Sequence, residues 1–373
     1  YFDYASTTKI REEVYEAMLP YLSVHYGNPS SLYSIGIDGK KLINECRSQI
    51  AALINCDSQE IYFCSGGTEA NNWALKGAMF AEKTKKALIT TKIEHHSVLN
   101  SCCFLEEMGY PVHYLDVDNE GFIDINQMKH IIDDETLMVS AMTANNEIGT
   151  IQRITDIGKL CREKNILFHT DAVQGMAHLS IDVQTSCIDL MSVAAHKFFG
   201  PKGIGFLYIR KNVKCENLLH GGKQERGKRA GTENVAYIVG MTKALELIEK
   251  EKQKDSIRER ILTELLFNKI KAKIKNVRLN GPKIGPERLP GNLNISFAGV
   301  DGNKLSYELN KHGVCVSTGS ACVFDSISAS HVLKAINVPP EYINGTLRIS
   351  LGKGTEMHDI DVISALIISN LSV

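Results

Sequence analysis

Between residues 61 and 209 the chain alternates short apolar runs with stretches of helical periodicity, and this alternation limits the possible folds more than any other feature. The helical stretches run from the SGGTE turn to about residue 81, over residues 97–108 and over residues 154–163. The apolar runs lie at residues 61–64, 87–91, 112–117, 137–142, 166–170, 190–193 and 205–209. Such alternation predicts βαβ units and an α/β fold with a mostly parallel sheet flanked by helices.

After residue 209 the pattern changes and predicts a second, smaller α+β domain. Residues 235–275 have the periodicity of a long, highly charged connecting helix. A strand over residues 293–297, a helix over Lys304–His312 and a strand over residues 346–351 follow it. We therefore expect a large domain over residues 12–250, and a small domain formed by residues 1–11 with 251–373.

Charge and cysteine content exclude several classes of function. The formal net charge of −1 gives no electrostatic reason to expect a nucleic acid or an anionic membrane as partner. No apolar run is long enough for a transmembrane helix. The ten cysteines form no C-x-x-C pair, which favours reduced thiols in a cytoplasmic protein over a disulfide framework or a metal site.

The segment DLMSVAAHKFFGPKGIG, residues 189–205, places a lysine where chemistry is plausible. An apolar strand ends at His196-Lys197, and a glycine-rich turn follows. A lysine amine desolvated at the end of a strand has a lowered pKa and can form a Schiff base with an aldehyde. A solvated loop lysine is the commoner explanation for a lone lysine.

Asp171 ends another apolar strand, in ILFHTDAVQ. Strand ends of a parallel sheet meet at one edge, where ligands bind. A pyridoxal 5′-phosphate (PLP) enzyme needs a Schiff-base lysine and an acid that keeps the pyridine nitrogen protonated. Lys197 and Asp171 would supply both.

Four further segments allow either a functional or an ordinary interpretation. SGGTE could cradle a phosphate at a helix N-terminus, or form a glycine turn with Thr68 as N-cap. His95, in Glu94-His95-His96, could stack on a cofactor ring or end a polar strand. Arg348 could bind a substrate carboxylate or form a surface ion pair. Cys322 ends the small-residue stretch STGSAC, as an exposed nucleophile would, although a plain turn would look the same.

Several motifs occur together in the order typical of one family. They are CSGGTEANN at Cys64–Asn72, EHHSV at Glu94–Val98, NNEIGTIQ at Asn145–Gln152, and then HTDAVQ, AHKFFGPKGIG, GGKQERGKRAGT and STGSAC. The chain resembles the cysteine desulfurases of the NifS/IscS-type (group I) branch, which belong to the class V aminotransferase family of fold-type I PLP enzymes. The resemblance covers essentially all 373 residues.

The resemblance implies a PLP site and assigns roles to the residues around it. Lys197 is implied as the Schiff-base lysine, and Asp171 as the partner of the pyridine nitrogen. Gln174 would contact the ring hydroxyl, His95 would stack on the ring and move protons, and Asn146 would lie beside the cofactor. The phosphate would be held by Gly67, Thr68 and His196, and by Thr232 from the other subunit of a homodimer.

The same resemblance implies a substrate and a reaction. Arg348, with Asn28 nearby, would bind the carboxylate of L-cysteine, and Cys322 would accept the sulfur as a persulfide while L-alanine is released. An iron–sulfur scaffold or a tRNA-thiolation enzyme would then take the sulfur. A selenocysteine lyase, another β-eliminating PLP enzyme and a non-catalytic sulfur-relay protein are the alternatives.

The sequence departs from the family pattern at three places. Ala194 stands where a hydroxyl residue is usual, so one phosphate hydrogen bond is expected to be missing. Lys223 replaces a glycine, and Val323-Phe324 replace small polar residues after Cys322. These departures bear on efficiency and partner choice more than on the reaction.

Overall fold

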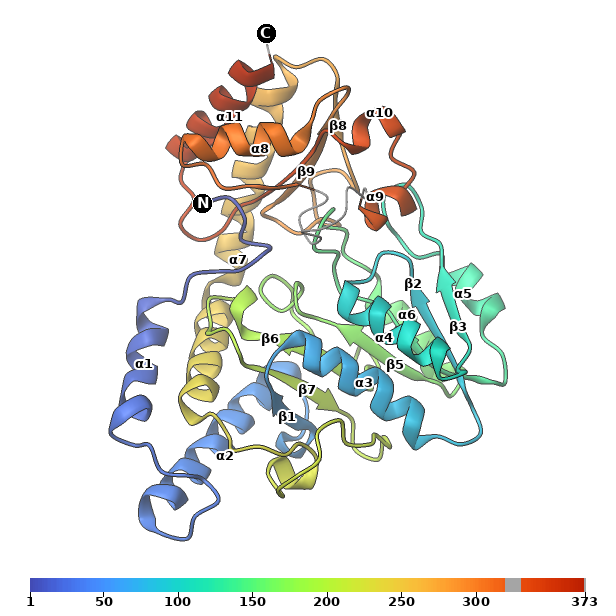
Figure 1. The fold of residues 1–373 in the computed structure, drawn as a ribbon, viewed down its shortest axis with the longest axis vertical. Coiled ribbons are helices and arrows are strands. Elements are labelled where there is room, and N and C mark those ends of the chain that lie inside the picture. The colour runs from blue at the N-terminus through green and yellow to red at the C-terminus, as the bar shows by residue number, and fades with distance from the viewer. Residues whose placement is uncertain (319–329, 372–373) are drawn as a thin grey trace.

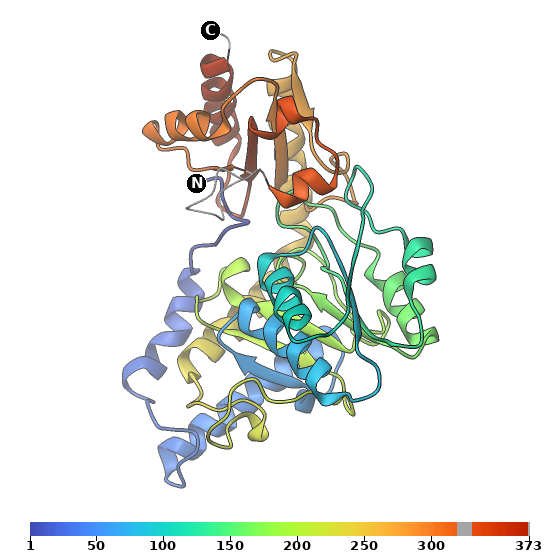
Figure 2. The same cartoon turned by 45° about the vertical axis from the view of Figure 1, so that its right-hand side comes forward.

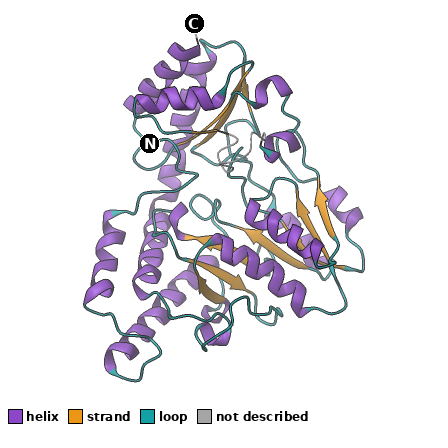
Figure 3. Cartoon of the chain, viewed as in Figure 1, coloured by secondary structure: helices purple, strands orange, loops and turns teal. Residues whose placement is uncertain are grey.

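The computed structural model describes residues 1–318 and 330–371, which form two β-sheets joined by one long helix (Figure 1). Figure 3 shows the strands in two separate groups, each with helices packed against it. In the part of the chain described, no helix is both long and apolar enough to cross a membrane.

The large sheet has seven strands in the order β1-β7-β6-β5-β4-β2-β3. They are β1 (Ile61–Cys64), β2 (Ala87–Thr91), β3 (Val112–Leu115), β4 (Thr136–Ser140), β5 (Leu167–Asp171), β6 (Leu190–Ala194) and β7 (Gly205–Ile209). Only β7 runs against the others, because it pairs antiparallel with both β1 and β6. The carboxyl ends of the remaining strands therefore lie at one edge.

Helices cover both faces of this sheet. They are α1 (Glu12–Ser23), α2 (Ser34–Ile54), α3 (Gly67–Ala81), α4 (His96–Glu107), α5 (Ile125–Ile131) and α6 (Ile154–Glu163). On one face α3 and α4 pack on strand residues such as Leu88 and Leu207. On the other face α2 and α6 pack on residues such as Phe168 and Phe206. Burial on both faces explains why β2, β4, β6 and β7 consist of buried residues throughout.

The small sheet is antiparallel, in the order β10-β11-β9-β8. Its strands are β8 (Val277–Leu279), β9 (Asn292–Phe297), β10 (Ser317–Thr318) and β11 (Thr346–Ser350). The helices of this part are α8 (Gly302–Lys311), α9 (His331–Ala335), α10 (Pro340–Ile343) and α11 (Met357–Leu371). Leu309 of α8 and Ile363 of α11 share a buried core with Ile295 and Ile349 of the sheet.

A single helix, α7 (Val235–Lys271), connects the two sheets. It has 37 residues, so it is roughly 55 Å long. Met241 and Leu245 of its first half pack under the large sheet, whereas Leu266 and Ile270 of its second half pack under the small one. The helix therefore contributes to both cores and fixes how far apart they lie.

The first eight residues also connect the two sheets, as the N-terminal segment in Figure 2 shows. Phe2 is buried in the core of the small sheet, and Asp3 forms a parallel bridge with Ser350. Thr8 then donates from its backbone N–H and its hydroxyl to the carbonyl of His196, both at 2.9 Å. The segment thus runs from β11 to the turn after β6 that contains His196 and Lys197.

The predicted α/β fold with a smaller α+β part is confirmed, and the strands lie within one or two residues of their predicted bounds. The sequence analysis did not assign α5, β8, β10, α9, α10 or α11. Cys46, Cys64, Cys161 and Cys187 lie in apolar or helical patterns, which predict small buried side chains, and the first three are buried. Cys187 is only half-buried, because it lies in a turn with φ of 51°.

Candidate active site

A cavity of about 210 Å³ lies at the carboxyl ends of the large-sheet strands, beneath the small sheet. Its wall combines these strand ends with Ala5 and Ser6 of the N-terminal segment and Arg348 of β11. Nine of the twelve predicted site residues line it: Gly67, Thr68, His95, Asn146, Asp171, Gln174, His196, Lys197 and Arg348. Segments that are far apart in the sequence therefore meet in one cavity.

Lys197 ends the short 3₁₀ helix Ala195–Lys197 that directly follows β6. Its Nζ donates to the carbonyls of Ala5 at 2.7 Å and Ser6 at 2.5 Å. The Ala5 carbonyl also accepts from Nε2 of Gln174 at 2.8 Å. The N-terminal segment thus holds both side chains at the cavity wall.

Asp171 is the last residue of β5, and its carboxylate is buried and fully hydrogen-bonded. Oδ1 accepts from the backbone N–H of Val173 at 2.9 Å, and Oδ2 accepts from Nδ2 of Asn71 at 2.7 Å. The same Asn71 nitrogen donates to the Ser97 hydroxyl at 2.8 Å. These donors fix the orientation of the carboxylate, and a carboxylate so placed can accept a hydrogen bond from a protonated ring nitrogen.

Sequence reasoning did not assign a role to Asn71 or Ser97. Asn71 follows Gly67 by four positions on α3, so both residues are on the same face of the helix. Asn71 lies inside the CSGGTEANN motif, and its helical spacing from Gly67 is the signal that could have identified it. Its Oδ1 is buried, with no hydrogen-bond partner among the described residues.

His95 is the N-cap of α4 and lines the cavity as a neutral ring. Its Nδ1 accepts from the backbone N–H of Ser97 at 3.1 Å, which places the ring proton on Nε2. Burial lowers the pKa of His95; the charge of Lys197 lowers it further, and Asp171 acts in the opposite direction. Protonation of this ring is therefore less favourable than protonation of a solvent-exposed histidine.

The start of α3 is an open anion cradle. The N-cap is Gly66, and no side chain caps the helix, so the prediction of Thr68 as N-cap is not supported. A Cβ on Gly67 would lie 2.7 Å from Cγ2 of Val173, so this turn accepts only glycine without displacing its neighbour. Unpaired N–H groups at a helix N-terminus bind anions such as phosphate.

His196 lines the same cavity. Its Nδ1 is 3.2 Å from the Thr7 hydroxyl. Burial lowers its pKa to about 4, with smaller contributions from Lys197 and Lys202. The ring is therefore neutral at physiological pH and can donate or accept one hydrogen bond towards a phosphate.

Together these groups fit PLP. The open start of α3 suits a phosphate, the Lys197 amine suits an aldehyde, and the secured carboxylate of Asp171 suits a pyridinium nitrogen. Among the described residues, no group of three or more His, Cys, Asp or Glu side chains could hold a metal ion.

Three predicted residues do not line this cavity. Asn28 is exposed in the turn between α1 and α2, where its Oδ1 accepts from the backbone N–H of Ser30 at 2.9 Å. Thr232 is exposed in the loop before α7. Cys322 lies outside the described residues. The roles predicted for these three stay predictions.

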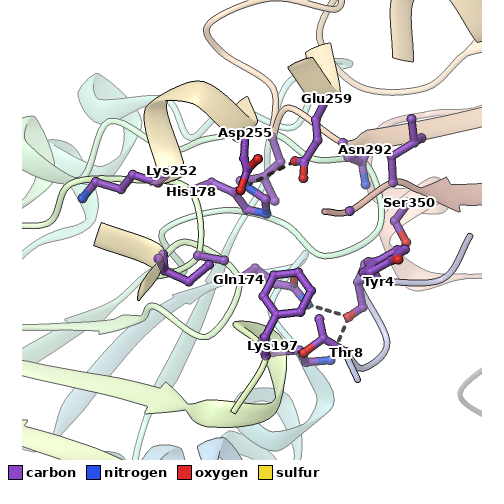
Figure 4. Close-up of a pocket in the computed structure, with 18 residues that line it drawn as sticks. Tyr4, Thr8, Gln174, His178, Lys197, Lys252, Asp255, Glu259, Asn292 and Ser350 are labelled. Atoms are coloured by element: carbon purple, nitrogen blue, oxygen red, sulfur yellow. Dashed lines mark hydrogen bonds and ion pairs between the residues drawn. The ribbon is translucent and has the colours of Figure 1, made fainter. Parts of the chain in front are cut away.

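A second cavity of about 40 Å³ lies on the other side of the N-terminal segment (Figure 4). It shares Ala5, Gln174 and Lys197 with the first. His178 and Glu259 face each other across it, with Nδ1 and Oε2 3.8 Å apart. This cavity lies between the two sheets, and Lys197 forms part of its wall.

Comparisons with known proteins give one consistent result. The family model for class-V aminotransferases matches residues 1–363. The chain is 50% identical to the cysteine desulfurase IscS of Clostridium botulinum (strain Hall), over 97% of this chain and 92% of that protein. Among solved structures, a NifS-like protein superposes with a TM-score of 0.94 at 35% identity, covering 100% of this chain and 99% of that one. A structure described as SspA in complex with cysteine gives 0.83 at 37% identity, covering 94% and 98%.

Proposed function

The chain belongs to the class-V aminotransferase family and, within it, to the cysteine desulfurases, and from this we propose how its residues carry out the reaction. The enzyme takes L-cysteine and yields L-alanine, and the sulfur passes to the thiol of Cys322. The Cβ–S bond of the substrate breaks and an S–S bond forms, so the products are alanine and an enzyme persulfide. The observation that supports this best is that nine predicted residues, from Gly67 to Arg348, line one cavity.

PLP is the proposed cofactor, and when bound it supplies the electron sink that allows Cα of the substrate to lose its proton. Lys197 would hold it through its amine, and Asp171 would hold the pyridine nitrogen. Gly67, Thr68 and His196 would hold the phosphate. The uncapped start of α3 and the hydrogen-bonded Asp171 support this assignment.

The chain's own residues bind the substrate and move its protons. Arg348, which is buried and lines the cavity, binds the substrate carboxylate, and Asn28 would contribute from the second copy of a dimer. Lys197 takes the proton from Cα, since its amine is held at the wall of the same cavity. His95, neutral with its proton on Nε2, stacks on the cofactor ring and receives or returns a proton beside it.

A homodimer is the proposed functional unit. Large apolar side chains are exposed on α1 and on the turn that leads to α2: Leu19, Leu22, Val24, Tyr26, Leu32 and Tyr33. Leu32 is 92% exposed, which is unusual for a leucine outside an interface. Thr232 and Asn28 are also exposed and do not line their own chain's cavity, so they are available to reach a second copy's site.

The remaining assignments concern organisation and context. We propose a boundary near residue 250, where α7 passes from the large sheet to the small one. All nine described cysteines are free, as expected for a cytoplasmic enzyme. The persulfide on Cys322 would be delivered to an iron–sulfur scaffold or a tRNA-thiolation enzyme.

Two variants test the proposal. Borohydride reduction of the holoenzyme followed by peptide mapping should place the pyridoxyl group on Lys197, and Lys197→Ala should lose it together with all turnover. Modification of Lys202 instead would contradict the assignment.

Cys322→Ala should bind PLP but fail to release sulfide with dithiothreitol, whereas Cys315→Ala should keep most activity. Sulfide release at the wild-type rate by Cys322→Ala would favour lyase chemistry over a persulfide.

A further inference from the structure

The guanidinium of Arg348 is held by a carboxylate from the other end of the chain. Nη2 lies 2.8 Å from Oδ1 of Asp3, and the two side chains are only 10% and 16% exposed. Nη2 also donates to the Ser317 hydroxyl at 3.1 Å, and Nη1 donates to the carbonyl of Asn146 at 3.3 Å. Arg348 lines the cavity and Asp3 does not.

These contacts use only part of the donor capacity of Arg348. A guanidinium has five N–H donors, and the contacts with Asp3, Ser317 and Asn146 engage only its two Nη atoms. The buried Nε–H has no hydrogen-bond partner among the described residues. An unpaired charged donor is costly to bury, and Nη1 has a second N–H that these contacts do not use, so the guanidinium keeps donor capacity for a ligand carboxylate in the cavity that Arg348 lines.

Asp3 is itself fixed in place by its neighbours. The carbonyl of Phe2 accepts from the backbone N–H of Ser350 at 2.8 Å, and the backbone N–H of Phe2 donates to the Cys315 carbonyl at 2.9 Å. On the other side, Ala5 donates from its N–H to the Ser350 hydroxyl at 2.9 Å. Because backbone contacts anchor both flanks, the Asp3 carboxylate offers Arg348 a rigid partner.

We propose that Asp3 is a positioning residue, which orients Arg348 so that the remaining donors of its guanidinium recognise the substrate carboxylate. The inference rests on the proposed function, since it takes Arg348 as the carboxylate-binding group. Glu147 is a half-buried acid near Arg348, but Asp3 is the carboxylate that forms an ion pair with the guanidinium among the described residues.

The test measures binding of two amines to the holoenzyme through the absorbance change of its cofactor. L-Alanine carries a carboxylate, and ethylamine is the same molecule without it. Asp3→Ala should weaken L-alanine binding about tenfold or more, since a charge-assisted contact loses its orientation, and leave ethylamine binding unchanged. Asp3→Asn keeps the Oδ1 acceptor, so it should weaken L-alanine binding only about threefold. With cysteine, KM should rise in the same order while kcat changes little.

Controls separate positioning from a purely structural role. Glu13→Ala removes a carboxylate from a different arginine pair, 2.7 Å from Arg11 and away from the cavity, and should change neither amine's affinity. Should Asp3→Ala fail to fold, Asp3→Ser replaces it, because its hydroxyl is too short to reach Arg348. Equal loss of both amines, or unchanged L-alanine binding, in the variant used would overturn the inference.

Substitution of Arg348 distinguishes this inference from the proposed function. Because lysine can still pair with a carboxylate, Arg348→Gln, which is neutral, is the deciding variant: if it binds L-alanine as well as the wild type does, Arg348 is not the carboxylate group and the proposed function fails at that point. If Arg348→Gln is weakened and Asp3→Ala is not, only the role of Asp3 is wrong.

Discussion

At the scale of single residues, the cavity depends on side chains that orient other side chains. The carboxylate of Asp171 is held in one orientation because Asn71 and the Val173 N–H donate to its two oxygens. Neither Asn71 nor Asp3 needs to touch the reacting atoms to affect the reaction. Substitution at such positions should change binding more than folding.

Asn71→Ala should loosen the cofactor without unfolding the protein. The variant removes one hydrogen bond to the Asp171 carboxylate, which contributes about 0.5–1.5 kcal/mol, so the cofactor should dissociate roughly two- to tenfold faster. Stopped-flow exchange of the bound cofactor measures this rate. Asn44→Ala, at an exposed position on α2, is the control. Identical rates in the two variants would show that the Val173 N–H alone secures Asp171.

Ala194→Ser should tighten the phosphate end of the cavity. Ala194 is buried at the end of β6, lines the cavity, and lies 3.6 Å from the Cβ position of Gly67. An added hydroxyl can donate one more hydrogen bond to a phosphate, so the cofactor should bind about two- to tenfold more tightly. Equilibrium dialysis gives the affinity. Weaker or unchanged binding would mean that other donors already satisfy the phosphate.

The sequence predicted nine of the cavity residues because strand ends and family motifs indicate them directly. Asn71 and Asp3 were not predicted, for a physical reason. Their importance arises from contacts with residues 100 and 345 positions away, which no local pattern encodes. The local sequence around Asn28 and Thr232 also could not show that these residues lie outside their own chain's cavity.

At the scale of elements, glycines decide how closely helices approach their neighbours. On α6, a Cβ at Gly158 would lie 2.0 Å from the backbone carbonyl oxygen of Ser186. On α7, a Cβ at Gly240 would lie 2.5 Å from the sulfur of Met18, at the end of a flexible side chain. The first neighbour is backbone and cannot move cheaply, whereas the second can change rotamer.

Gly158→Ala should therefore destabilise the protein, and Gly240→Ala should be nearly neutral. Alanine gains about 1 kcal/mol of helix propensity over glycine at both sites. At Gly158 the clash should outweigh this gain by about 1–3 kcal/mol. Urea unfolding of the two variants side by side measures the difference. A stabilised Gly158→Ala would show that the loop at Ser186 shifts easily.

Elements were predictable from the sequence where their burial is regular. The strands of the large sheet are buried on both faces and appear as continuous apolar runs, and the helix over residues 154–163 was predicted to the residue. The short elements were not predicted, because β10 has two residues and α10 has four. Their structure comes from pairing and packing within the small domain rather than from any pattern of their own.

At the scale of the whole molecule, a buried acid lies where α7 passes between the sheets. Glu259 is 3% exposed, and its Oε2 has no hydrogen-bond partner among the described residues. Burial raises its pKa to about 8; Arg258 acts against this and Asp255 adds to it. Across the second cavity, burial lowers the pKa of His178 to about 4, so the pair is neutral at physiological pH.

The stability of the protein should therefore fall as pH rises from 6.5 to about 8. The folded state holds a proton on Glu259 that an unfolded chain, with a carboxyl pKa near 4.5, has already lost, so raising the pH favours unfolding. Below pH 6.5, His178 has the opposite effect on stability. As the pH falls, this ring takes up a proton in the unfolded chain before it does so in the folded chain, so lowering the pH favours unfolding. Glutamine is neutral at every pH in this window, so the Tm of Glu259→Gln should fall less between pH 6.5 and 8 than the Tm of the wild type.

Thermal unfolding at pH 6.5 and at pH 8, the limits of the window that the two groups define, checks this. Glu264→Gln, at an exposed position on the same helix, should keep the wild-type slope. Parallel slopes for Glu259→Gln and the wild type would mean that Glu259 is ionised in the fold. The buried Glu94, whose pKa is also raised to about 8, would then account for the remaining slope.

The order in which a ribosome makes this protein determines when the bridge between Asp3 and β11 can form. All seven strands of the large sheet, with Asp171 and Lys197, have been synthesised by residue 209. Arg348 emerges roughly 7 to 30 seconds later at usual elongation speeds. Until then residues 1–8 have no strand to pair with, although Asp3 must finally meet a partner 345 positions away. The nascent chain can therefore complete the sheet that carries Lys197 before Arg348 has been made, and residues 1–8 are among the last to pair although they precede both sheets in the sequence.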